Sequence, residues 1–474
     1  MPLNTVPLIQ IFASQQAQTL RDKLCATLRQ LIASGTLLRG ERLPSSRLMA
    51  ADLSLSRVTV EAAYTQLESE GYLSRKTGKG TFIAITEQRQ QVRKTAPPAP
   101  LSLSSRGRRI VATGGCQDPL YPQAFAAGSP DLRAFPHDIW RRLTAQRLRS
   151  REAIMGYGDP QGLPELRRAV SRYLAQSRGV RCAAEQVTIL TSSQQALHML
   201  ATLLCESGER VCMEEPGYRG AYHAFVSAGA EISGLELDGC GAKIPNPARA
   251  KLIYLTPSHQ YPTGVTMSLS RRLQCLAYAN MHDSWLIEDD YDSEFYYDEQ
   301  PMPALQGLDD NGRVLYLGTF SKALFPSLRL AYLVVPPALV EPFCRMRSVM
   351  DGHSAQLMQA VTADFISHGH FQAHLRLMRK LYASRRDLLL TQLAEKIGDR
   401  LRPQSHSGGL QLTVTLPGGG EERLTRAALN AGLILPRLSP LYRGPVHQEG
   451  WLLGFSALQR AEIINAIDKL ARLF

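Results

Sequence analysis

The segment YLGTFSKALFPSLR (316–329) combines a lysine with an arginine seven positions later. A lysine amine placed directly after an apolar strand can act as a nucleophile toward a carbonyl group. Arg329 offers a planar cation that can bind a phosphate through two hydrogen bonds, which Lys cannot match geometrically. Thr319 and Ser321 add hydroxyl groups just before Lys322. The segment therefore predicts covalent chemistry at Lys322 beside a phosphate site.

A second segment, TSSQQAL (191–197), lies between a strand-like run and a helical one. Small residues there allow the backbone N–H groups of a helix N-terminus to approach a phosphate. Ser193 and Gln194 add side-chain donors. An ordinary serine N-cap would give the same pattern, so the segment alone leaves both interpretations open.

Two more segments follow apolar strands. EEPGY (214–218) ends on Tyr218, whose flat ring can cover a flat ligand or pack as a structural tyrosine. IEDDYDSEF (287–295) puts Asp289 and Tyr291 at the carboxyl end of a strand, where an open α/β sheet binds its ligand. The other carboxylates of this segment are interpreted as solvent-facing or as a second layer around the site.

The elements that must position these residues alternate between strand and helix. Helical segments separate the apolar runs, and the pattern becomes helical beyond about residue 351 and mixed α/β after Lys396. This alternation predicts an α/β domain with a mostly parallel sheet and a small C-terminal α/β lobe. The predicted strands are 187–190, 251–255, 285–289, 314–318 and 330–335.

The first 85 residues have a different organisation. Residues 17–34 place leucines and an isoleucine on one helical face, and Gly35 ends that helix. Short helices over 46–53 and 57–70, with Val58, Ala62 and Leu67 facing inward, predict a helix-turn-helix. Strands over 72–75 and 81–84 predict a hairpin wing with the basic tip KTGKG (76–80).

Composition sets limits on the remaining possibilities. The chain has 474 residues with 44% hydrophobic and 20% charged, contains no apolar run long enough to span a bilayer and begins without an export signal, so a cytoplasmic protein is expected. Of the net charge of +12, half lies within residues 1–95, which suits a binder of phosphate backbones. The eight scattered cysteines show no metal-ligand spacing, and no metal site is expected.

The N-terminal motifs LPSSR (43–47), SRVTV (56–60), AYTQLESEG (63–71) and GKGTF (78–82) resemble those of the GntR family of winged-helix regulators. The resemblance implies DNA contacts from the second helix and from a wing tip in the minor groove, with Tyr64 and Leu67 in the core. The implied DNA-binding residues are Arg47, Ser56, Arg57, Thr59, Gly78, Lys79 and Gly80.

From residue 117 onward, the four segments described above resemble the cofactor site of fold-type I aminotransferases. That family implies pyridoxal 5′-phosphate held as an aldimine (Schiff base) on Lys322, with Asp289 on the pyridine nitrogen, Tyr291 on the 3′ oxygen and Tyr218 on the ring. The remaining implied cofactor contacts are Ser193, Gln194, Thr319, Ser321 and Arg329.

Two departures from ordinary aminotransferases concern the side that binds the substrate. Tyr261 replaces the asparagine that precedes Pro-Thr-Gly, and Leu452 occupies the position of the arginine that binds the substrate carboxylate. Arg437 or Arg443 could supply a carboxylate contact instead, and the sequence does not decide between them. Tyr157, in GYGDP (156–160), and His259 are further candidates for contacting an effector.

Together the two parts resemble the MocR subfamily of GntR regulators, with a winged helix-turn-helix (1–85), a flexible linker (86–116) and an aminotransferase-like domain (117–474). The resemblance implies a homodimer that binds paired DNA half-sites and senses an amine or amino acid through Lys322 rather than acting as an enzyme. An active aminotransferase with a DNA-binding appendage and a sensor of pyridoxal phosphate itself are the alternatives. Loss of the carboxylate arginine favours regulation.

Overall fold

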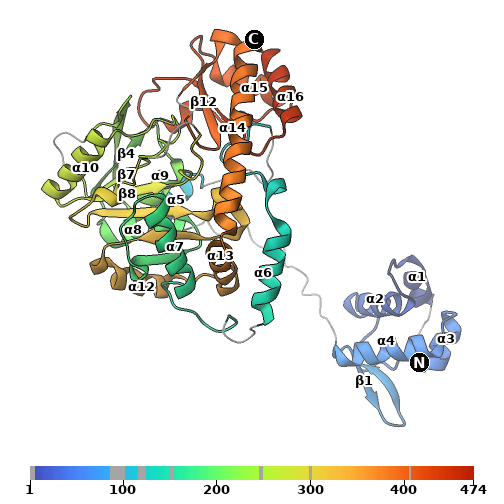
Figure 1. The fold of residues 1–474 in the computed structure, drawn as a ribbon. Coiled ribbons are helices and arrows are strands. Elements are labelled where there is room, and N and C mark those ends of the chain that lie inside the picture. The colour runs from blue at the N-terminus through green and yellow to red at the C-terminus, as the bar shows by residue number, and fades with distance from the viewer. Residues whose placement is uncertain are drawn as a thin grey trace. The chain divides into compact units, whose positions relative to one another are not determined.

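The protein is represented by a computed structural model that describes residues 6–85, 102–115, 124–149, 154–244, 249–297, 302–404 and 407–474. The chain separates into two compact units at the boundary between Ser102 and Leu103. Figure 1 draws the N-terminal unit in blue and the other from cyan to red. Each unit has its own hydrophobic core.

The N-terminal unit is a helical module with a two-stranded hairpin, as the sequence predicts. Ser45 and Ser56 cap the two helices of the helix-turn-helix, each accepting a backbone N–H with its hydroxyl oxygen. The strands pair antiparallel with Leu73 opposite Ile83. The elements are α1 (Val6–Ser14), α2 (Leu20–Ala33), α3 (Ser46–Asp52), α4 (Arg57–Ser69), β1 (Leu73–Lys76) and β2 (Gly80–Ile83).

The core of this unit corrects part of the sequence prediction for the second helix. Tyr64 and Leu67 are buried as expected, and the Tyr64 hydroxyl donates to the Pro44 carbonyl. Val58, however, is 78% exposed and Ala62 is also exposed. The inward-facing residues of α4 are Val60, Ala63, Tyr64 and Leu67, because these positions, and not Val58, share one face at the helical period.

The second unit contains an eight-stranded sheet in the order β3-β10-β9-β8-β7-β4-β5-β6. Four of its strand pairs are parallel, while β10 runs antiparallel to both of its neighbours and β6 antiparallel to β5. The strands are β3 (Val187–Leu190), β4 (Arg210–Glu215), β5 (Glu231–Asp238), β6 (Gly241–Ala242), β7 (Leu252–Leu255), β8 (Trp285–Asp290), β9 (Val314–Thr319) and β10 (Ala331–Val334).

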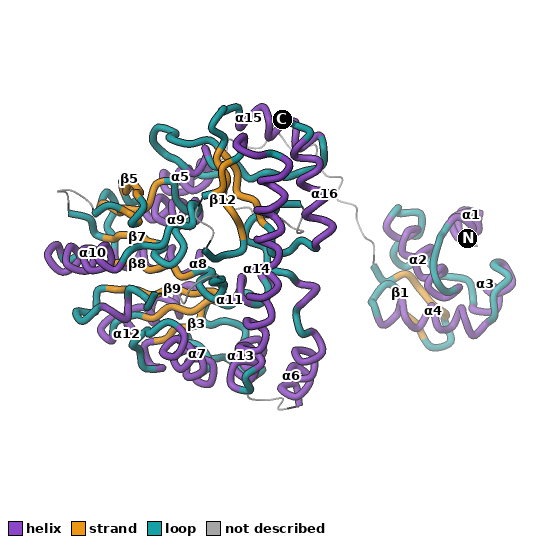
Figure 2. Tube along the Cα trace, turned by 45° about the horizontal axis from the view of Figure 1, so that its top comes forward, coloured by secondary structure: helices purple, strands orange, loops and turns teal. Residues whose placement is uncertain are grey.

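Helices cover both faces of this sheet (Figure 2). One face packs on α8 and α9, and the opposite face packs on α7, α10 and α13. These helices and their neighbours are α6 (His137–Arg149), α7 (Pro164–Ser177), α8 (Ser193–Leu204), α9 (Arg219–Ala228), α10 (Leu269–His282), α11 (Phe320–Ala323), α12 (Pro337–Met350) and α13 (Gln356–Ser367).

A 27-residue helix, α14 (His370–Lys396), leads to the C-terminal lobe. The lobe contains a three-stranded antiparallel sheet in the order β11-β12-β13, and its last helix packs against α14 (Figure 1). The elements of the lobe are β11 (Arg402–Pro403), β12 (Gln411–Thr415), α15 (Glu421–Asn430), β13 (Gly450–Gly454) and α16 (Arg460–Ala471).

The predicted linker contains a helix. Most of 86–116 lies outside the described residues, but α5 (Ser105–Ala112) is capped by Ser104 and contacts α9. The basic run SRGRR, interpreted as part of an extended linker, is therefore helical and belongs to the second unit. Among the described residues, no helix is long and apolar enough to cross a membrane.

Candidate functional site

The site lies at one edge of the large sheet. The carboxyl ends of β4, β7, β8 and β9 meet there because these strands are parallel, and β3 runs in the same direction as β9 because both pair antiparallel with β10. Each predicted motif spans or follows the carboxyl end of one of these strands. The topology thus brings together segments that lie up to about 130 positions apart in the sequence.

Lys322 lies in α11, directly after β9. Thr319 ends the strand and caps this helix, because its hydroxyl oxygen accepts the Ser321 N–H at 3.1 Å. The Lys322 Nζ donates to the Gly128 carbonyl at 2.8 Å. Gly128 has φ +67°, and a Cβ built on it would lie 3.0 Å from the Lys322 Nζ. Sequence reasoning missed Gly128, whose only signal was its place in the turn AGSPD (127–131).

Asp289 is buried near the end of β8. Its Oδ2 accepts the Tyr254 hydroxyl at 2.7 Å, whereas its Oδ1 is buried and accepts no hydrogen bond from a described residue. Burial, and then the charges of Asp290 and Asp292, raise the pKa of Asp289 to about 7. An unsatisfied buried carboxylate oxygen is costly, so the Oδ1 position fits a ligand N–H or cation. The pyridine N–H of pyridoxal phosphate would satisfy it.

The neighbouring acidic residues are not exposed to solvent. Asp290 forms a buried ion pair with Arg178 at 2.8 Å, and Asp292 accepts from the His259 ring at 3.0 Å. Of the two interpretations from the sequence, solvent-facing residues or a second layer around the site, these carboxylates fit the second. Their role is to hold the loop that follows β8.

Three tyrosines line this edge of the sheet. The rings of Tyr218 and Tyr261 meet edge to face at 5.7 Å between centroids, and those of Tyr261 and Tyr291 at 6.1 Å. Gly220 is needed beside Tyr218, since a Cβ there would lie 2.4 Å from the Tyr218 ring. Tyr261, which replaces the asparagine of ordinary aminotransferases, thus links the two tyrosines predicted to contact the cofactor.

The segment predicted to bind the phosphate lies at the N-terminus of α8, after β3. Ser192 caps α8 by accepting the Gln195 N–H at 3.1 Å, so Ser193 and Gln194 occupy the first turn of the helix. The Gln194 amide donates to the Gly220 carbonyl at 2.9 Å, so its side-chain nitrogen is engaged within the protein. The backbone N–H groups of this turn are the donors that a helix N-terminus offers to an anion.

Arg329 ends the short turn after Lys322. It has φ +52°, a left-handed conformation that is uncommon for a residue with a side chain. It is exposed, and its guanidinium forms no ion pair within the described parts of the chain. A strained, unpaired arginine close to Lys322 is suited to binding an anionic group such as a phosphate.

The structure distinguishes among the candidates for effector binding. Arg443 is engaged, because it pairs with Glu215 at 2.9 Å and lies over the Tyr222 ring. His259 is buried against Asp292, and a Cβ at Gly408 would lie 2.3 Å from its ring. Arg437 forms no ion pair among the described residues and bridges to Trp451 through its backbone. Tyr157 is fully exposed at 102%.

Leu452 lies on β13, where it is paired with Thr413 of β12. Directly opposite residues of an antiparallel pair project from the same face of a sheet. The Thr413 hydroxyl donates to the Pro262 carbonyl at 2.5 Å, so this face lies against the SHQYPTG loop (258–264). The Leu452 side chain is buried. The resemblance to aminotransferases places their carboxylate arginine at this position.

The basic residues predicted to contact DNA are exposed. Arg47, Arg57 and Lys79 form no ion pair among the described residues, although Arg57 contacts the Ser46 hydroxyl at 3.4 Å. Ser56 has a structural role, since its Oγ accepts the Thr59 N–H at 3.1 Å. Gly78 and Gly80 have φ +74° and +111°, which the tight wing turn requires.

Comparisons with known proteins agree with both parts of this description. Residues 125–470 match the family of class I and II aminotransferases, and residues 20–83 match the bacterial regulatory proteins of the gntR family. The class defined by fold and site is therefore a GntR winged helix-turn-helix joined to a fold-type I aminotransferase domain.

Whole-length relatives narrow this class. The chain is 40% identical over 467 residues to the probable rhizopine catabolism regulatory protein MocR of Rhizobium meliloti, covering 95% of this chain and 93% of that protein. It is 31% identical to the regulator TauR of Rhodobacter capsulatus, over 98% of this chain and 99% of TauR. The chain belongs to the MocR-like regulators of the GntR family.

Solved structures similar to the second unit are aminotransferases. Kynurenine aminotransferase of Pyrococcus horikoshii, crystallised with PMP, gives a TM-score of 0.70 at 26% identity, covering 80% of this chain and 96% of that one. LysN of Thermus thermophilus, an α-aminoadipate aminotransferase complexed with N-(5′-phosphopyridoxyl)-L-leucine, gives a TM-score of 0.69 at 27% identity. The match covers 78% of this chain and 94% of that one. This fold family is one that uses pyridoxal phosphate.

Proposed function

We propose that this protein is a DNA-binding transcription regulator that holds pyridoxal phosphate through Lys322 and responds to a small amine or amino acid. When bound, pyridoxal phosphate supplies an aldehyde that condenses reversibly with primary amines. Lys322 holds the cofactor covalently, Asp289 Oδ1 accepts its ring N–H, and Tyr291 and Tyr218 contact its 3′ oxygen and ring face. Arg329 and the first turn of α8 bind its phosphate.

The buried Asp289 Oδ1 without a donor supports the assignment of the cofactor. A carboxylate there keeps a ring nitrogen protonated, and Lys322 contributes a nearby charge that lowers the Asp289 pKa, opposing the effect of burial.

The observation that favours regulation over catalysis is Leu452. A transaminase orients its substrate by pairing the carboxylate with an arginine, and an apolar residue at that position removes the pairing. Arg437 beside β13 is the cation that remains available for an effector carboxylate, because Arg443 is paired with Glu215. A ligand could therefore bind through Arg437 without taking the geometry that proton transfer at Lys322 requires.

Two exposed features support binding of DNA and of a second copy. Arg47, Arg57 and Lys79 are cations on a winged helix, the arrangement used to contact phosphates and base edges. Tyr157 and Met155 are 102% and 71% exposed, which favours their contact with another protein surface in a homodimer. Two linked winged helices would bind paired half-sites.

The experiment is a DNA-binding assay with the upstream region of the protein's own gene and a panel of amines and amino acids. One class of amine should change the affinity at a concentration that leaves the loaded protein's transamination rate negligible. Fast transamination of the same compounds with unchanged DNA binding would instead support the enzyme alternative. Equal DNA binding with and without pyridoxal phosphate, in every condition, would exclude the cofactor as the effector.

A further inference from the structure

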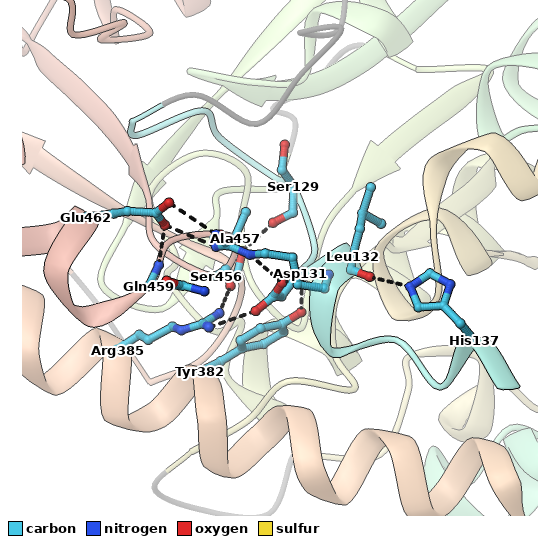
Figure 3. Close-up of polar contacts among 11 residues, drawn as sticks. Ser129, Asp131, Leu132, His137, Tyr382, Arg385, Ser456, Ala457, Gln459 and Glu462 are labelled. Atoms are coloured by element: carbon cyan, nitrogen blue, oxygen red, sulfur yellow. Dashed lines mark hydrogen bonds and ion pairs between the residues drawn. The ribbon is translucent and has the colours of Figure 1, made fainter. Parts of the chain in front are cut away.

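The segment that contacts Lys322 is bonded to α14 and to the C-terminal lobe, and Figure 3 shows these bonds for Ser129 and Asp131. The Gly128 carbonyl accepts a hydrogen bond from the Lys322 amine. The residues that follow, 129–133, run between α14 and the end of the C-terminal lobe. The Ser456 hydroxyl donates to the Ser129 carbonyl at 2.5 Å. The carbonyl that meets Lys322 is therefore one residue from a contact with the lobe.

Arg385 of α14 joins this segment to the lobe. One guanidinium nitrogen donates to Asp131 Oδ2 at 2.7 Å and another donates to the Ser456 carbonyl. Tyr382, one turn earlier on α14, accepts the Asp131 N–H through its hydroxyl at 2.8 Å. Asp131 and Arg385 are 5% and 8% exposed, so both are shielded from solvent.

A second contact reaches the last helix. Arg133 donates to Asp131, to the Ala457 carbonyl and to Glu462 of α16, the last at 3.1 Å. Burial disfavours the Asp131 carboxylate, but hydrogen bonds from Arg385 and from the Arg133 N–H outweigh it and hold the Asp131 pKa below its usual range. The group is thus charged and fully bonded, which gives it a single well-defined geometry.

The same helix also contacts the lysine's own turn. His374 of α14 donates through Nε2 to the Ala323 carbonyl at 3.2 Å, and burial lowers its pKa to about 4, so the ring is neutral. His374 and Arg385 are eleven positions apart, or about 16 Å along a helix. One rigid element therefore supports both Lys322 and the segment that accepts its amine.

We propose that Arg385 is a positioning residue that transmits the state of Lys322 to the C-terminal lobe. This inference rests on the proposed function. A free lysine ammonium has three donors and gives Gly128 a charge-assisted hydrogen bond, whereas a nitrogen bonded to the cofactor carbon has at most one donor. Displacement of Lys322 by an amine therefore strengthens the contact with Gly128, and Asp131, Arg385 and Ser456 carry the change to the lobe.

Hydrogen exchange of the full-length protein, with and without saturating pyridoxal phosphate, tests this inference. In the wild type, loading should change exchange by about fivefold both in 128–135 and in 455–465, the size of a modest coupling free energy. Arg385→Lys keeps the charge but offers one donor nitrogen in place of the two that bond Asp131 and Ser456, so the change in 455–465 should shrink markedly while the loading persists. Tyr382→Phe, which removes only the hydroxyl that accepts the Asp131 N–H, should reduce the exchange response of 455–465 by less.

Asp364→Asn is the matched control, because Asp364 forms a comparable arginine pair with Arg147 between α6 and α13. It should retain the wild-type response. The inference is overturned if 455–465 does not respond to loading in the wild type, or if both α14 variants respond fully. A wild type that shows no visible absorbance with pyridoxal phosphate would instead overturn the proposed function, so the two failures are distinguishable.

Discussion

The ε-amine of Lys322 donates to the backbone carbonyl of Gly128, 194 positions earlier in the chain, at 2.8 Å. The contact joins the turn after β9 to a segment that the C-terminal lobe and α14 hold in place. Lys322 therefore lies between the sheet edge that would bind the cofactor and the lobe that lies beside it.

Lys322→Ala should abolish the visible absorbance that the protein acquires on incubation with pyridoxal phosphate, because no other residue of the site can supply the amine. Absorption spectra of the purified proteins measure this directly. Lys380→Ala, an exposed lysine on α14, is the control and should behave as the wild type. An unchanged spectrum for Lys322→Ala would contradict the assignment.

Gly128→Ala should weaken cofactor loading by about tenfold, since its Cβ would lie 3.0 Å from the Lys322 Nζ and its φ of +67° disfavours a side chain by about 1 kcal/mol. Gly352→Ala separates the two causes. Gly352 has a similar φ of +75° with nothing within 4 Å, so that variant should lose stability alone. Titration of each protein with pyridoxal phosphate gives the comparison, and equal affinities would refute a specific role for Gly128.

Asp289→Asn should change how stability depends on pH in the cofactor-free protein. Burial raises the Asp289 pKa from 3.8 to about 7, so the folded state takes up a proton that the unfolded state has released. The associated stability is present below about pH 4 and is lost as the pH rises toward 7. Asp289→Asn does not suffer this loss. Between pH 5 and pH 8, its free energy of unfolding should therefore rise by about 1 kcal/mol or more relative to that of the wild type, as measured by urea denaturation. Parallel pH profiles would show that Asp289 is charged throughout.

Arg57→Ala and Lys79→Ala should each reduce affinity for the operator and lower the salt dependence of binding by about one unit in log–log slope, the effect of losing one phosphate contact. Arg21→Ala in the same unit is the control, since Arg21 pairs with Asp22 on α2. Fluorescence anisotropy at several salt concentrations measures both quantities. An unchanged slope for Arg57→Ala would mean that it does not contact a phosphate.

Sequence patterns predicted five strands of the large sheet (β3, β7, β8, β9 and β10) to within a residue or two, because continuous apolar runs end at polar motifs. The strands β5 and β6, at one end of the sheet, were not predicted. The patterns also placed Asp289, Tyr291 and Lys322 at strand ends. They misplaced Val58, since an apolar residue next to a helix start need not face inward. They could not find Tyr254, Gly128 or Arg385, whose roles depend on contacts between segments far apart in the chain.

A contact between distant segments also separates Arg437 from Arg443. Both are arginines in one polar loop, and only the tertiary pairing of Arg443 with Glu215 separates them. Likewise, the basic run at 105–109 has the composition of a linker, yet a serine cap and packing on α9 make it helical.

The most direct test is to make the attachment of pyridoxal phosphate to Lys322 irreversible with borohydride and then measure the DNA-binding response to the effective amine. Untreated protein should respond, and the reduced protein should bind DNA but no longer respond, because the amine cannot displace Lys322. A reduced protein that responds as fully as the untreated one would contradict sensing through Lys322.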